Sequence, residues 1–149
     1  SLICGGVRMA FWDNKQVTVI NRSMDPKTEK ETYYVTLIER ADLVRAQQKN
    51  VSAKGTDSAD VATLYVSFGN MPKPYVTPEE WKRLPEDKKK DCMTFSPTED
   101  IFILGNCTGA TFPDRDVYQW AREHYSDVYR VTRCNIYEDV LTHYEVGGA

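Results

Sequence analysis

The sequence lacks the features that mark several large protein classes. Its 149 residues contain no apolar run near the roughly 20 residues that a membrane-spanning helix needs, so we expect no membrane insertion. Residues 1–12 show neither a long apolar stretch nor a clear cleavage motif, which argues against an intact signal peptide. No repeat, low-complexity stretch or linker divides the chain. These absences predict one domain over residues 1–149, and the glycine-bearing ends are compatible with a domain excised from a longer protein.

Cofactor and metal signatures are also missing. The four cysteines, at positions 4, 92, 107 and 134, form no C-x-x-C pair, and the chain has only two histidines. Neither of the glycine-rich phosphate-binding fingerprints, G-x-x-x-x-G-K-[ST] or G-x-G-x-x-G, occurs. We therefore predict no cofactor and no metal site.

Charge excludes a further class. The net charge is -3, and residues 76–149 hold nine Lys and Arg against fourteen Asp and Glu, while residues 1–75 hold ten against eight. Neither half carries the basic footprint of a protein that neutralises many phosphates, so nucleic-acid binding is not expected. The hydrophobic fraction of 41% and the mean hydropathy of -0.54 fit a soluble domain with a real core.

Two signals about the compartment disagree. Scattered, unpaired cysteines favour buried thiols in an intracellular, reducing environment. Three N-x-[ST] sequons, at Asn21, Asn50 and Asn106, among only six asparagines keep an extracellular, glycosylated domain with one or two disulfides as an alternative.

Residue patterns predict an α+β fold. We expect one mainly antiparallel or mixed sheet of about five or six strands, with two or three helices packed on it and covering one face. β-Branched and aromatic runs predict the strands at residues 6–12 and 16–21 (a hairpin), 32–39, 60–68, 100–105 and 128–137. Helices are predicted over 40–49, from Thr77 onward and from about Asp114 to Asp127, and 138–146 fits either type.

The helix after Thr77 has the clearest start signal. Thr77 is a suitable N-cap, Pro78 suits the first helical position, and Glu80 completes a capping box. Trp81 is then expected to face inward, and Pro85 must end or kink the helix.

The loop GNCTG, residues 105–109, follows a hydrophobic strand and resembles the small-residue pattern of a nucleophile elbow. In that interpretation Cys107 is the nucleophile, His124 or His143 the base, and Asp116, Asp127 or Asp139 the orienting carboxylate. Phosphate binding by the loop is disfavoured because Asp114 and Asp116 put negative charge there. Those two side chains are better explained as helix caps.

The simpler interpretation of this loop is a tight turn in which Gly105 and Gly109 supply positive φ angles. Pro113 also delays the helix that should follow an elbow at once. We therefore assign no catalytic residue and keep a small cysteine-dependent enzyme as the alternative.

The helix near residues 114–127 carries two stripes at 100° per residue. The predicted core face comprises Val117, Trp120, Ala121, His124 and Val128. The adjacent flank comprises Tyr118, Arg122, Tyr125 and Tyr129. Tyrosine and arginine provide contact area with a polar tip, as protein-binding surfaces do, although tyrosines at a core boundary need no partner.

These features favour recognition over chemistry. The sequence predicts a non-catalytic protein-interaction or assembly module that binds a protein partner or itself, through a sheet edge or through the tyrosine and arginine flank.

Overall fold

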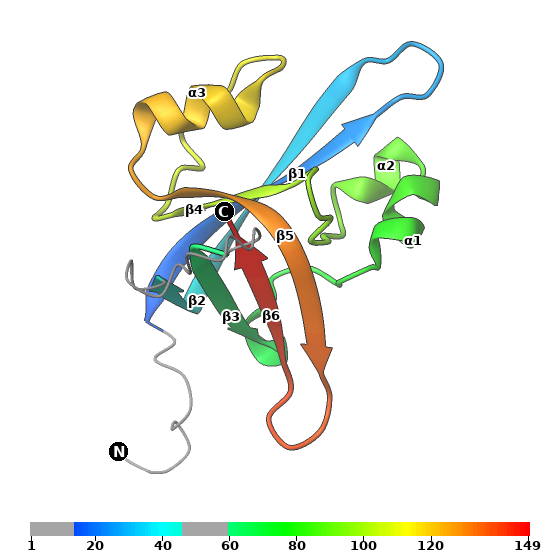
Figure 1. Cartoon of the computed structure of the whole chain (residues 1–149). Coiled ribbons are helices and arrows are strands. Elements are labelled where there is room, and N and C mark those ends of the chain that lie inside the picture. The colour runs from blue at the N-terminus through cyan, green and yellow to red at the C-terminus, as the bar shows by residue number, and fades with distance from the viewer. Residues whose placement is uncertain (1–13, 46–59) are drawn as a thin grey trace, which may run out of the picture.

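The computed structural model describes residues 14–45 and 60–149. All the strands pair antiparallel and close into a barrel in the order β1-β2-β3-β6-β5-β4 (Figure 1). The elements are β1 (Lys15–Met24), β2 (Glu31–Arg45), β3 (Ala62–Ser67), a 3-10 turn (Phe68–Asn70), α1 (Pro78–Arg83), α2 (Glu86–Lys89), β4 (Ile101–Leu104), α3 (Val117–His124), β5 (Val128–Tyr137) and β6 (His143–Gly148). The predicted α+β class, with six antiparallel strands and three α-helices, is confirmed for the part of the chain described.

Two apolar cores share strands β1 and β4. Val17 and Val19 of β1 and Phe102 of β4 point into the barrel. Ile20 and Ile103 point outward, where they pack under α3. Both strands are thus buried on both faces, which explains why residues 101–104 form a continuous apolar run instead of alternating with polar residues.

The predicted strands at 32–39, 60–68, 100–105 and 128–137 correspond to β2, β3, β4 and β5. Of the predicted first hairpin, residues 16–21 lie within β1, which pairs with β2 and β4, and residues 6–12 lie outside the described ranges. The ambiguous segment 138–146 resolves into a loop followed by β6.

The helix predicted over residues 40–49 is wrong as far as the structure describes it. Residues 40–45 continue β2, and 46–49 lie outside the described ranges. Leu43 pairs with Leu64 of β3 and is 4% exposed. Ladder hydrogen bonds and burial of this kind outweigh a weak local helix propensity.

The capping box of α1 is confirmed. Thr77 Oγ1 accepts a hydrogen bond from the Glu80 amide at 3.2 Å, and Glu80 Oε1 accepts one from the Thr77 amide at 2.8 Å. The helix ends at Arg83, before Pro85, as predicted. Trp81 is buried, and its Nε1 donates to the Arg22 carbonyl at 3.1 Å, which ties α1 to β1.

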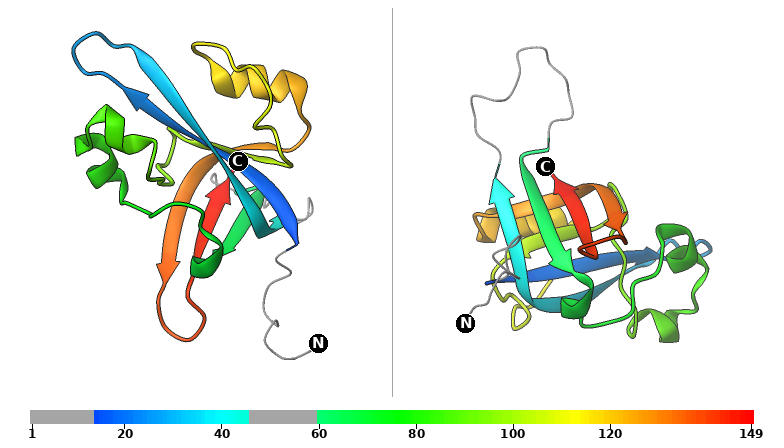
Figure 2. Two further views of the ribbon diagram at one scale, coloured as in Figure 1. Left: turned by 180° about the vertical axis from the view of Figure 1, so that it is seen from behind. Right: turned by 90° about the horizontal axis from the view of Figure 1, so that it is seen from below.

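The strands of the sheet close into a ring, and two hairpins extend from this ring (Figure 2). The β1–β2 hairpin extends past Ile20, the last β1 residue paired with β4, and the β5–β6 hairpin extends away from β4 in the same manner. Free sheet edges for association are therefore confined to these hairpins in the described part of the chain. No helix within residues 14–45 and 60–149 is long and apolar enough to cross a membrane.

Gly148 provides a test of barrel packing. A Cβ atom at this position would lie 2.6 Å from Phe102 Cζ and 2.8 Å from Tyr129 Cβ. Overpacking of this kind costs about 1–3 kcal/mol, so Gly148→Ala should lower the free energy of unfolding by that amount in urea titrations. Gly109→Ala is the matched control, because an added Cβ there meets nothing within 4 Å. Equal stability of the two variants would contradict the packing described here.

Candidate functional site

A cleft of about 320 Å³ lies between the β1–β2 hairpin and α3. We call it the Arg22 cleft. Its apolar lining comes from Ile20, Ile101 and Val117. Its polar lining consists of Arg22, Glu31, Tyr33, Thr98, Glu99, Asp116, Tyr118 and Arg130. Polar side chains therefore make up most of the lining of this cleft, with three apolar side chains among them.

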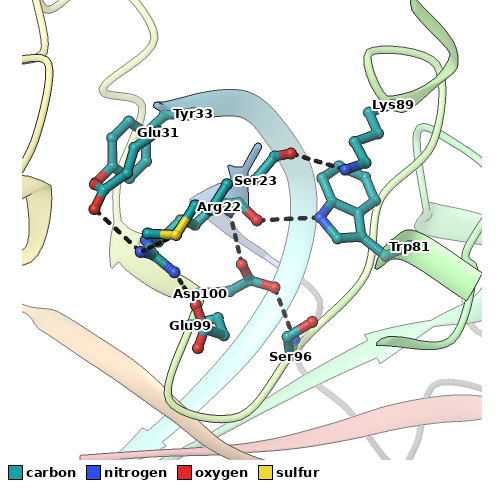
Figure 3. Close-up of polar contacts among 10 residues, drawn as sticks. Arg22, Ser23, Glu31, Tyr33, Trp81, Lys89, Ser96, Glu99 and Asp100 are labelled. Carbon is teal, nitrogen blue, oxygen red and sulfur yellow. Dashed lines mark hydrogen bonds and ion pairs between the residues drawn. The ribbon is translucent and has the colours of Figure 1, made fainter. Parts of the chain in front are cut away.

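Arg22 is the centre of the polar network in this cleft (Figure 3). Its guanidinium bonds Glu31 Oε2 at 3.0 Å and also contacts Glu99, so one cation joins β2 to the segment before β4. The Tyr33 hydroxyl donates to the other oxygen of Glu31. This bond and the Arg22 contact hold the pKa of Glu31 below its ordinary value. Burial, with Glu31 beside the hydroxyl, raises the pKa of Tyr33 to about 12.

Asp100 supports Arg22 from the side of the barrel. It is fully buried, and its carboxylate accepts hydrogen bonds from the Arg22 amide at 2.8 Å, the Ser96 amide at 2.7 Å and Asn21 Nδ2 at 3.0 Å. Removal from water raises the pKa of Asp100 to about 6 despite these donors, because burial penalises the charged form. The same network holds Asn21 at 0% exposure, so the sequon at Asn21 is closed to a glycan in this fold. Asn106 is exposed, and Asn50 lies outside the described ranges.

A second support comes from α1 and α2. Lys89 is only 4% exposed, and its Nζ donates to Ser23 Oγ at 2.8 Å and to Glu86 at 3.2 Å. The ammonium also lies 5.5 Å from the centre of the Trp81 ring. The backbone at residues 22–23 is thus held both by Asp100 and by the helical segment. This fixes the base from which the Arg22 side chain projects.

A second hollow, of about 670 Å³, adjoins the C-terminal end of α3. We call it the α3 hollow. Three of the four predicted binding residues, Arg122, Tyr125 and Tyr129, line it. The fourth, Tyr118, lines the Arg22 cleft and accepts a hydrogen bond from Arg122 Nη1 at 3.0 Å. Arg130 lies 4.0 Å from the centre of the Tyr118 ring. The predicted residues therefore connect the two hollows along one face of the molecule.

Tyr129 does not lie on the helical flank where the sequence placed it. It belongs to β5, because α3 ends at His124. Its ring is 8% exposed and packs on Phe102 inside the barrel, while its hydroxyl donates to Asp127 at 2.9 Å. Tyr129 thus contributes only its edge to the α3 hollow.

The residues proposed for cysteine catalysis are separated. Cys107 is 6% exposed and packs beneath α3 with Val117. Asp116 and His124 lie at opposite ends of that eight-residue helix, about 12 Å apart along its axis. Asp116 is therefore too distant to orient the His124 ring.

Three expectations about α3 itself are wrong. His124 is exposed instead of lying in the core, with its ring stacked on Trp120 and its Nδ1 2.8 Å from the Trp120 carbonyl. Asp116 takes the N-cap position in the left-handed region at φ 57°, but its side chain makes no capping hydrogen bond. The helix begins at Val117, three residues later than the sequence suggests.

The GNCTG loop is a turn with one glycine in the left-handed region. Gly105 has φ 108°, as predicted, whereas Gly109 does not have a positive φ. Asn106 Oδ1 accepts a hydrogen bond from the Thr108 amide at 3.1 Å and so closes the turn. The Cys107 amide donates to Thr18 Oγ1 at 2.9 Å, which fixes the loop to β1.

Thiols and acidic residues show no sign of a metal centre in the described part of the chain. Cys92, Cys107 and Cys134 are free thiols there. Within residues 14–45 and 60–149, no three His, Cys, Asp or Glu side chains come together in a way that could hold an ion.

Sequence reasoning missed Arg22, Glu31 and Asp100. Arg22 and Glu31 lie diagonally across the β1–β2 hairpin, because Arg22 pairs with Tyr33 and Glu31 with Met24, and long side chains of opposite charge can meet across such a diagonal. Asp100 gave no signal, since its partners lie more than 70 residues away in the chain, apart from Ser96.

The fold and its cleft define a small antiparallel six-stranded barrel with a helix packed across its outer face and a pocket built from paired charges. A family model matches residues 11–149, and the chain belongs to that family, described as a family of unknown function (DUF6751). No curated protein and no solved structure gives a significant match.

The raised pKa of Asp100 predicts a pH dependence of stability. Protonation of Asp100 stabilises the folded state below about pH 4, and this contribution, at most about 3 kcal/mol, is lost as pH rises through 6. Asp100→Asn removes the titration, so its destabilisation relative to the wild type should be larger at pH 4 than at pH 7. Urea unfolding at both values measures this difference, with the exposed Asp87→Asn as control. The same destabilisation at both pH values would show that Asp100 does not titrate in this range.

Proposed function

We propose that this protein is a non-catalytic protein-recognition module and that it binds its partner across the α3 face, defined as the Arg22 cleft, the α3 hollow and the Tyr118–Arg122 pair between them. The observation that carries the proposal is the continuity of this surface. Two hollows of about 320 and 670 Å³ flank one tyrosine–arginine pair on a single short helix.

The chemistry of the α3 face suits protein recognition. Tyr118, Arg122 and Tyr125 are the residue types that dominate binding energy in protein interfaces. Tyr118 lies between Arg122 and Arg130, which orders its ring before a partner arrives. Ordering before binding lowers the entropic cost of association.

The polar groups of the cleft favour recognition over catalysis. Arg22 is already paired with Glu31 and Glu99, and Tyr33 with Glu31, so these groups satisfy one another. Arg130, by contrast, makes its described side-chain contact with the Tyr118 ring, so its guanidinium N–H groups remain open to a partner's carboxylate or carbonyl. We infer that the paired charges set the shape of the cleft and that Arg130 and Arg122 supply its contacts.

A photo-crosslinking side chain at position 122 tests the proposal in the cells that make this protein. We expect one defined polypeptide adduct from position 122 and none from exposed position 39 on β2, because position 122 lies on the α3 face and position 39 lines none of the hollows. Identical adducts at both positions, or none at 122, would contradict the proposal.

The adduct then permits a quantitative test with purified components. Arg122→Ala should weaken binding of the identified polypeptide at least tenfold, about 1.4 kcal/mol, in calorimetry. Gln119→Ala is the matched control, since Gln119 is exposed on the same helix but lines neither hollow. Equal loss in both variants would indicate a general effect on α3 instead of a contact at Arg122.

The alternative, a cysteine-dependent enzyme using Cys107, makes an opposite prediction. A catalytic thiolate would react with iodoacetamide faster than the other thiols near neutral pH. Because Cys107 is 6% exposed and Cys92 is half-buried, we expect Cys107 to be labelled more slowly than Cys92. Peptide mass spectrometry over a time course measures the two rates. Faster labelling of Cys107 would favour the enzyme.

A further inference from the structure

The loop between β5 and β6 presents apolar side chains to solvent. Val140 is 97% exposed and Leu141 41% exposed, between the exposed Tyr137 and the ring of His143. We call residues 137–143 the hairpin tip. Exposed apolar side chains gathered at one projecting point are typical of an interaction site.

The hairpin tip is ordered by its own contacts. The rings of Tyr137 and His143 stack at 4.8 Å with an interplanar angle of 12°. The Tyr137 hydroxyl donates to Glu145 at 3.1 Å, and His143 Nδ1 lies 2.6 Å from the Leu141 carbonyl. Because these contacts hold the loop in place, burying Val140 and Leu141 against a partner costs little additional conformational entropy.

A hollow of complementary character lies at the other hairpin. It measures about 300 Å³ between the end of the β1–β2 hairpin and α1. Met24, Pro26 and Trp81 contribute its apolar wall, and Lys82 contributes charge. We call it the Trp81 hollow. Its apolar wall and its volume of about 300 Å³ suit small apolar side chains such as those of Val140 and Leu141.

Charge is complementary between the two surfaces. The hairpin tip carries Glu138 and Asp139 beside its apolar residues. Three cations line the Trp81 hollow, but Arg22 is paired with Glu31 and Glu99, and Lys89 is paired with Glu86. Lys82 therefore supplies the positive charge of the hollow that is not already neutralised. Lys82 forms no ion pair with any residue in 14–45 or 60–149, so it is available to a carboxylate from outside.

One copy cannot close this contact on itself. In Figure 1 the β5–β6 hairpin points away from the barrel, opposite to the side where the β1–β2 hairpin, α1 and α2 lie, and the reverse view in Figure 2 agrees. Each copy therefore offers a tip on one side and a hollow on the other. From this arrangement we propose that the protein assembles head to tail, with the hairpin tip of one copy seated in the Trp81 hollow of the next.

The contact is heterologous, because two different surfaces meet, so repetition generates a ring or an open chain instead of a symmetric dimer. It uses neither Arg122 nor the α3 hollow, which stay free for a partner in every copy, although Arg22 and Glu99 line both the Trp81 hollow and the Arg22 cleft. The head-to-tail contact and the partner-binding proposal can thus fail separately.

Sedimentation velocity of the purified chain over a wide concentration range tests self-assembly. The wild type should form species larger than a dimer as concentration rises, and Val140→Asp or Lys82→Glu should weaken self-association at least tenfold. Exposed matched controls, Val44→Asp and Lys88→Glu, should assemble like the wild type. Circular dichroism checks that all four variants fold. A wild type that stays monomeric, or tip and hollow variants that assemble normally, would overturn the proposal.

Mixing the two defective variants tests the head-to-tail geometry itself. Val140→Asp retains a working hollow and Lys82→Glu a working tip, so an equimolar mixture should form dimers and nothing larger. A mixture that remains monomeric would overturn the heterologous contact, as would dimers formed by Lys82→Glu alone, which indicate tip-to-tip association. Arg122→Ala should leave all of these results unchanged.

Discussion

The double pairing and double burial of β1 is the constraint on which the rest of the structure depends. β1 bonds β2 on one edge and β4 on the other, which closes the ring. Its inward side chains fill the barrel, and Ile20 supports α3 from outside. The same strand continues past the ring into the hairpin that carries Arg22. One strand therefore links the barrel core, the helix layer and the cleft.

Charge burial near β1 follows from this arrangement. Asp100 lies where the strand leaves the ring, so its carboxylate can accept hydrogen bonds from backbone amides that have no strand partner there. Removing one partner from such a network leaves a buried polar group without a hydrogen bond, and this costs more free energy than a single hydrogen bond contributes. The network therefore holds the neighbouring loop in place. Arg22 projects from the same residues, so its ion pairs begin from a fixed backbone.

Closure also decides where binding surfaces can occur. A closed ring has no continuous free edge, so association must use what projects from it. Three features project: α3 with its flanking hollows, the β1–β2 hairpin with α1, and the β5–β6 hairpin with Val140 at its tip. In our proposals α3 and its hollows bind the partner, and the two hairpins, with α1, form the head-to-tail contact.

Local chemistry in the sequence determined the capping box at Thr77, the apolar run of β4, the β-branched content of β5 and the Tyr118–Arg122 spacing on α3, because each depends on residues within a few positions of one another. Tertiary structure alone decided the rest. Residues 40–45 became strand through pairing with β3, Tyr129 turned into the barrel because α3 ended early, and Asp100 met Asn21 across 79 positions. These outcomes depend on contacts made only when the ring closes, and no local pattern encodes them.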